Sequence, residues 1–285
     1  MISIYDDDTG AIATSFVGDV YATMLTSPTG FETLRFNQSS DSSTDNAVKF
    51  DGGVATFVGL FVNEAGSGYT LRYVAREDYV TAIAMVDGDE FSVDTGTAYQ
   101  IAFSTDPGSA TGGSLISPQP VVEVQDVGGN QVSAHSEGFV VASILPEYNP
   151  ISAELRGTTT VAFTNGIATF FDLHINEMGS PYMLAFAYVA GPSGELPGTQ
   201  SVVYSNPFAV GIGPGYSMHL VEDPSTGHVR GGAAFEIPAR VEVRDQGGNL
   251  LALDSESAVE CSFANNPSDG SLTPLQCCQR QQGGS

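Results

Sequence analysis

The residues best suited to catalysis are few and scattered along the chain. The four histidines lie at positions 135, 174, 219 and 228. When the chain is aligned with itself, His174 falls opposite Phe61 and His219 opposite Ala102. A base needed in every copy of a repeat would recur, although a site confined to one copy fits this pattern too. The sequence has no G-x-S-x-G elbow, H-E-x-x-H motif or Walker loop, so we expect no enzyme activity.

Acidic residues are abundant enough to suggest cation binding. The chain carries 33 Asp and Glu against 9 Lys and Arg, a formal charge of −24. Two clusters offer the oxygen ligands that calcium prefers, but neither has the spacing of a known calcium loop: Asp6, Asp7 and Asp8, and Asp87, Asp89 and Glu90. The alternative is a surface kept soluble by mutual repulsion. We therefore expect no cofactor, with calcium as the weaker hypothesis, and no nucleic-acid partner, because a basic footprint is missing.

The three cysteines all lie in the last 25 residues and are candidates for disulfides or crosslinks: Cys261, Cys277 and Cys278. An odd number leaves one thiol unpaired or paired with another chain. Cys261 falls opposite Ala142 in the self-alignment, which predicts a small buried core residue. The vicinal pair lies in a polar tail and is better placed for crosslinking.

One asparagine, Asn37 in Asn-Gln-Ser, is a candidate glycosylation site if the chain is secreted; a chance occurrence explains the motif equally well. No apolar run approaches the roughly 18 residues needed to cross a bilayer, and the start MISIYDDDTG lacks the pattern of a signal peptide. We expect no membrane insertion.

Composition favours many short strands. Hydrophobic residues make up 41% of the chain and charged residues 15%, with 33 Gly and 15 Pro to form turns. No stretch longer than about ten residues has a convincing helical period. The predicted fold class is therefore all-β.

Self-alignment reveals an internal repeat. Residues 53–75 (GVATFVGLFVNEAGSGYTLRYVA) recur at 166–190 with an offset of 113, which becomes 115 at the last alanine after a two-residue insertion. GTAYQIAFSTDP, from residue 96, matches GPGYSMHLVEDP, from residue 213. VVEVQDVGGN, from residue 121, matches RVEVRDQGGN, from residue 240, and a degenerate copy begins the chain at an offset of 120.

These matches predict three tandem repeats. The first repeat (residues 1–95) lacks its first strand region, the second repeat (96–212) is complete, and the third repeat (213–285) is the N-terminal part of another copy. The glycine-rich segment 211–215 (GIGPG) is then a junction, since no helix follows it to present to a phosphate.

Alternation within the repeat predicts sandwich strands. Tyr182, Leu184, Phe186 and Tyr188 alternate with smaller residues, the period of a strand with one buried face. Roughly seven short strands fit each repeat, as in a β-sandwich. The D-x-G-G-N loop predicts a hairpin turn in which both glycine and asparagine take positive φ.

The motifs G-[VI]-A-T-F, L-x-[VI]-N-E-x-G-x-x-Y-x-L and V-E-V-x-D-x-G-G-N together resemble the immunoglobulin-like repeats of large extracellular adhesins, with a similar cadence in filamin-type repeats. The resemblance covers essentially the whole chain. It implies tandem immunoglobulin-like β-sandwiches with a structural or adhesive role outside the cell or at its surface. The absence of tryptophan and of a Cys pair between the sheets departs from antibody-type domains.

The mismatched ends suggest how copies assemble. A sandwich without its first strand exposes an open edge, and the third repeat contains the block that the first lacks. We expect this block to add to the first repeat of another copy, head to tail, through Tyr216, Met218 and Leu220. One alternative is a fragment of a longer array whose neighbouring residues complete both partial repeats. The other is a module whose loops bind a glycan or a protein.

Overall fold

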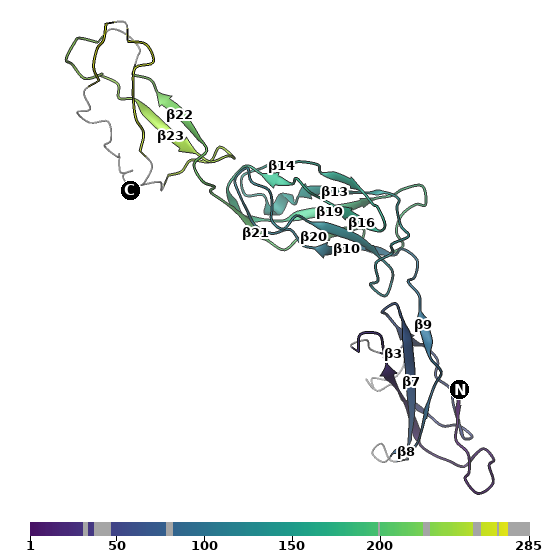
Figure 1. The fold of residues 1–285 in the computed structure, drawn as a ribbon. Helices are drawn as coiled ribbons and strands as arrows, with labels where there is room; N and C mark the ends of the chain where they lie inside the picture. The colour runs from purple at the N-terminus through teal and green to yellow at the C-terminus, as the bar shows by residue number, and fades with distance from the viewer. Residues whose placement is uncertain are drawn as a thin grey trace.

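The computed structural model describes residues 1–30, 34–36, 47–77, 82–198, 200–224, 229–252, 258–266 and 268–272. Within these ranges the chain consists of strands and one short 3₁₀ helix, and almost all strand pairs are antiparallel. The predicted all-β sandwich fold is confirmed. Figure 1 shows the strands of the first, second and third repeats in separate parts that follow one another end to end. The boundaries at residues 95/96 and 212/213 stay predictions.

The second repeat holds the largest set of strands. Its elements are β10 (Gln100–Thr105), β11 (Ala110–Thr111), β12 (Val121–Gln125), β13 (Phe139–Ile144), η1 (Pro146–Tyr148), β14 (Leu155–Arg156), β15 (Thr160–Ala162), β16 (Ile167–Thr169), β17 (His174–Ile175), β18 (Gly179–Tyr182), β19 (Leu184–Val189), β20 (Val202–Tyr204) and β21 (Phe208–Gly211). They form the sheets β10-β12-β16, β15-β13-β19-β20, β11-β21-β18 and β14-β17.

A single apolar core joins these sheets. In β19 the alternating residues Leu184, Phe186 and Tyr188 are buried, as the period-two pattern predicts. The ring of Phe186 packs edge-on against Phe103 of β10 and Phe170, which follows β16, with centroids 5.1 and 5.2 Å away. The sheet that contains β19 therefore faces the sheet that contains β10 and β16, which makes the repeat a sandwich.

The first and third repeats have fewer described strands. The first repeat contains β1 (Ile2–Ser3), β2 (Asp19–Thr26), β3 (Leu34–Phe36), β4 (Ala47–Lys49), β5 (Val54–Ala55), β6 (Leu60–Val62), β7 (Gly66–Arg76), β8 (Ala82–Asp87) and β9 (Phe91–Val93). The third repeat contains the hairpin of β22 (Ser217–Glu222) and β23 (Arg240–Arg244).

Strand pairing in the first repeat copies that of the second. Ala22 pairs with Tyr73 between β2 and β7, as Ala142 pairs with Phe186 between β13 and β19. The same offsets of 120 and 113 hold for the pair β1 and β5 against β12 and β16. The internal repeat found in the sequence is therefore a repeat of strand register.

One detail of the sequence alignment is wrong. The alignment placed Ala75 opposite Ala190, whereas the partner of Ala75 is Val20 and the partner of the equivalent Val140 is Tyr188. The offset thus stays at 113 up to Ala75. The two-residue insertion falls after the strand, because the pairing with β2 runs on without a break at this end.

The third repeat copies the first hairpin of the second. Met218 pairs with Val243 as Ile101 pairs with Val124, and both hairpins have a bulge at the same place, before Glu222 and before Thr105. The prediction for Cys261 is wrong, because this residue is exposed. Its counterpart Ala142 is buried by pairing with β19, whereas residues 258–263 form no strand.

Candidate assembly surfaces and inter-repeat joints

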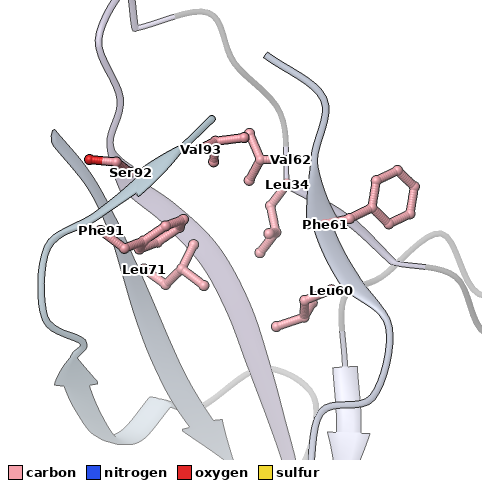
Figure 2. A pocket seen from close by; sticks show the side chains of 8 residues that line it. All are labelled: Leu34, Leu60, Phe61, Val62, Leu71, Phe91, Ser92 and Val93. Atoms are coloured by element: carbon pink, nitrogen blue, oxygen red, sulfur yellow. The ribbon is translucent and has the colours of Figure 1, made fainter. Parts of the chain in front are cut away.

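An apolar groove opens on the side of the first repeat. It measures about 300 Å³ and is lined by Leu34, Leu60, Phe61, Val62, Leu71, Phe91, Ser92 and Val93. Figure 2 shows the side chains of Leu34, Leu60, Leu71 and Phe91 converging from both walls, while the ring of Phe61 points away. Strands β3, β6, β7 and β9 supply these residues.

The same positions are closed in the second repeat. Leu173 and Ile175, the counterparts of Leu60 and Val62, are fully buried. The segment between β10 and β12 covers them: Ile116 N donates to Leu173 O at 3.0 Å, and Gly113 N donates to Ile175 O at 3.1 Å. The groove is therefore the space that this covering segment fills in the second repeat.

The described part of the first repeat has no counterpart of β10 or β11. In the second repeat the Ile101 N–H, on β10, donates to Gln200 O, just before β20. Strand β8, the counterpart of β20, is exposed along its whole length, including Ile83, Met85 and Val86. Exposed apolar patches of this kind mark sites of protein association.

The third repeat carries the missing elements, and its described residues form no buried apolar core beneath them. Met218 and Leu220 are 65% and 50% exposed, whereas Ile101, the counterpart of Met218, is fully buried. Phe235, the counterpart of Ile116 at the offset of 119, is also exposed. The predicted assembly residues thus lie together on or just before β22, with the Tyr216 N–H donating to Arg244 O at 2.8 Å.

Strand β22 is not free, since five residue pairs join it to β23. The sequence predicted that this block adds to another copy as a single strand. The structure instead presents a two-stranded hairpin with one apolar face.

Among the described residues, the other candidates predicted from the sequence do not form a shared site. Asn37, Cys277, Cys278 and His228 lie outside the described residues. His135 and His174 contact the backbone oxygens of Glu137 and Asp172 at 2.8 and 2.9 Å, a structural role for both rings.

The two acidic clusters are partly engaged by protein groups. Arg72 forms a two-pronged ion pair with Asp87 at 2.6 and 2.9 Å, which lowers the pKa of Asp87 mainly through hydrogen bonding. Asp6 accepts hydrogen bonds from the hydroxyl and amide of Thr9 at 2.7 and 2.8 Å, which lower its pKa. No group of three or more metal-ligating side chains occurs in the described ranges. Calcium binding stays a hypothesis.

The joints between repeats were not predicted from the sequence. The D-x-G-G-N loop of the second repeat sits against the N-E-x-G loop of the first: Asn130 Nδ2 donates to Asn63 O at 2.6 Å, and Ala65 N donates to Asn130 Oδ1 at 2.7 Å. Both ends of one amide side chain are thus used across the boundary.

The second joint repeats these contacts. Asn249 Nδ2 donates to Asn176 O at 2.7 Å, and Met178 N donates to Asn249 Oδ1 at 3.0 Å. Both motifs recur in register in the sequence, which was the signal that could have linked them. The expectation of positive φ holds at Gly129 and Gly248 but is wrong for the asparagines, whose side chains instead reach the preceding repeat.

At each joint, the aspartate of the D-x-G-G-N loop accepts a hydrogen bond from the start of its own repeat. Asp126 Oδ2 accepts the Gly96 N–H at 2.7 Å, and Asp245 Oδ2 accepts the Gly213 N–H at 2.9 Å, which fixes the chain entering each repeat. Burial alone would raise the pKa of Asp126, but hydrogen bonds from Gly96, Asn130 and Gly128 outweigh it and lower the pKa. Because the pKa of Asp126 is lowered, the hydrogen bonds to its ionised carboxylate stabilise the folded state at neutral pH. This stabilisation is lost only as the pH falls through the lowered pKa.

Comparisons with known proteins leave the family open. No family model matches the chain, and no curated protein matches it. Among solved structures, one similar chain is surface layer protein SbsC, domains 4–9, with 14% sequence identity and a TM-score of 0.27. The match covers 88% of this chain and 32% of that chain, so this protein spans about a third of its length. A likeness this low supports no argument about fold or function.

Within the described residues, no helix has the length and apolarity to pass through a lipid bilayer.

Proposed function

We propose that the protein is a structural subunit of an extracellular fibre or surface stalk, built from immunoglobulin-like β-sandwich repeats. The hairpin β22–β23 of one copy completes the first repeat of the next copy, head to tail. The observation that carries the proposal is the match between two exposed surfaces: a groove in the first repeat, and the apolar hairpin β22–β23 with the segment between its strands. The counterpart of that segment, between β10 and β12, closes the same site in the second repeat.

The second repeat supplies the register of the completed sandwich. There Val122 of β12 pairs with Ala168 of β16, so Val241 of β23 takes its place opposite Ala55 of β5. In the single chain Ala55 pairs with Ile2 of β1, a strand of two residues. The five-residue strand β23 displaces this short strand, and β22 comes with it as the outer strand. A whole hairpin adds because β22 keeps its pairing with β23.

The segment that connects β22 to β23 completes the fit, because its counterpart is the covering segment of the second repeat. In the second repeat the turn at Gly112 and Gly113 touches the following D-x-G-G-N loop, where Gly247 N donates to Gly112 O at 3.0 Å. The third repeat has the same pair at Gly231 and Gly232. In the assembled fibre this turn lies against Gly128, at the joint between the first and second repeats of the acceptor.

Removing residues 213–285 is expected to abolish polymers, because the deletion removes the hairpin and leaves the groove. Negative-stain electron microscopy and light scattering of the full chain and the truncated chain measure the effect. The full chain forms filaments and the truncated chain stays monomeric. Polymers of the truncated chain, or a full chain that stays monomeric at high concentration, would refute assembly by this hairpin; the second result would favour a longer array completed in cis.

A further inference from the structure

The two joints between repeats share the same set of hydrogen bonds, and each of these bonds connects one repeat to the repeat before it. At each joint the asparagine amide binds one carbonyl and one N–H that lie two residues apart in the N-E-x-G loop: Asn63 O and Ala65 N, then Asn176 O and Met178 N. An amide is the side chain that offers a donor and an acceptor at once. These contacts are satisfied only when the preceding repeat is in place.

The loop that receives the asparagine is held by the core of its own repeat. The hydroxyl of Tyr69 donates to Glu64 O at 2.8 Å, and the hydroxyl of Tyr182 donates to Glu177 O at 3.0 Å. Both tyrosines are fully buried. The N-E-x-G loop is therefore fixed to the sandwich, and a contact with it fixes the next repeat to the same body.

Glycine allows the two loops to approach closely. A Cβ atom added at Gly128 would overlap Asn63 O, and one added at Gly247 would overlap Asn176 O. Neither glycine has positive φ, so the requirement for glycine comes from the neighbouring repeat and not from the turn. The first glycine of D-x-G-G-N thus serves contact, and the second, at Gly129 and Gly248, serves the turn.

We infer that the D-x-G-G-N loop is a latch that fixes the orientation of each repeat on the one before it. The asparagine side chain forms hydrogen bonds with the N-E-x-G loop of the preceding repeat, and the aspartate accepts a hydrogen bond from the chain that enters its own repeat. The first glycine leaves room for the asparagine carbonyl of the N-E-x-G loop. The latch makes the array a stiff rod where the short linkers alone would leave it hinged. This inference does not depend on assembly between copies.

Spin labels on either side of the first joint test the latch. Cysteines replace Val58 and Phe171, which are 67% and 74% exposed, and the three native cysteines become serine. Labelled chain is diluted with unlabelled chain, and pulsed electron paramagnetic resonance gives the distance distribution. We expect a narrow distribution in the parent and at least a twofold broader one in Asn130→Ala and in Gly128→Ala.

Two controls separate the latch from general damage to the loop. Gln131→Ala removes a neighbouring hydrogen bond, from Gln131 Nε2 to Asn165 O at 3.0 Å, that stays within the second repeat. Gly211→Ala adds a methyl group whose nearest neighbour, Ala110 O, lies at 4.0 Å, an ordinary contact within the second repeat. Both should keep the narrow distribution. Gly128→Ala deletes no side-chain hydrogen bond, so its broadening together with an unchanged melting curve shows loss of the joint alone. An unchanged width in both test variants would overturn the inference.

Discussion

Replacing Phe186 with alanine is expected to destabilise the second repeat by about 3–5 kcal/mol, the usual cost of removing a large buried aromatic side chain. Phe186 is fully buried and packs against Phe103 and Phe170 from the facing sheet. Its removal leaves a cavity between both layers of the sandwich. Chemical denaturation followed by circular dichroism measures the free energy of unfolding.

The equivalent residue in the first repeat is the matched control. Tyr73 pairs with Ala22 as Phe186 pairs with Ala142, but Tyr73 is only half-buried. Tyr73→Ala should therefore cost clearly less in the dilute monomer. An equal loss at both positions would show that the first repeat already has a closed core, and would contradict the open groove.

Changing both Met218 and Leu220 to aspartate is expected to abolish filaments while leaving the single chain folded. Both side chains are exposed in the single chain, so the substitutions cost the monomer little. In the assembled state they occupy the places of Ile101 and Phe103 in a sandwich core. Losing two such buried side chains costs about 3–6 kcal/mol, which weakens association by about 10²- to 10⁴-fold. Sedimentation of filaments at increasing protein concentration measures the shift.

His219→Asp is the matched control for this variant. His219 lies between the two test positions on β22 and faces the opposite side of the hairpin, where added charge stays in solvent. It should assemble like the parent. Filaments at unchanged concentration from the double variant would show that this face does not enter the contact.

Much of the fold could be predicted from the sequence, because a half-buried strand shows an alternation of large apolar residues and a structural repeat shows recurring motifs. The alternation around Tyr182 and Leu184 predicted a buried strand, and the offsets of 113 and 120 predicted repeats whose strand pairs are equivalent in the structure. The end of the match between residues 53–75 and 166–190 was predicted wrongly. Ala190 has the same residue type as Ala75, but the strand pairing makes Tyr188 the equivalent of Ala75.

The joints and the surface of the third repeat were harder to predict. Asparagine after two glycines is typical of a turn, and local chemistry alone does not tell a turn residue from one that binds a neighbouring repeat. Cys261 alternates with Val259 and Phe263 at a spacing of two residues, but such alternation buries a side chain only where other strands pack against it, and Cys261 is exposed. In both cases the outcome depends on contacts with a partner far away in the sequence.

In the proposed assembly, the contacts of the latch favour displacement of β1 by the hairpin of another copy. In the degenerate first loop Gly10 stands where Asn130 stands in the second repeat, so this loop has no amide to grip a preceding repeat. The hairpin of the preceding copy carries Asn249, which is already bonded to the second repeat of that copy. In the proposed assembly, displacement of β1 with its loop would therefore give an array with a latch at every joint.

A disulfide trap tests head-to-tail assembly most directly. In the second repeat Leu115 and His174 are bridge partners, and their counterparts are Ala234 and Phe61. With the native cysteines changed to serine, Ala234→Cys combined with Phe61→Cys should give a ladder of covalent multimers under mild oxidation. The control pair, Ala234→Cys with Val58→Cys, should give none, because Val58 is strongly exposed at the counterpart of the outward-facing Phe171. A ladder from the first pair alone is the predicted result; its absence, or equal ladders from both pairs, would contradict completion of the first repeat by the hairpin.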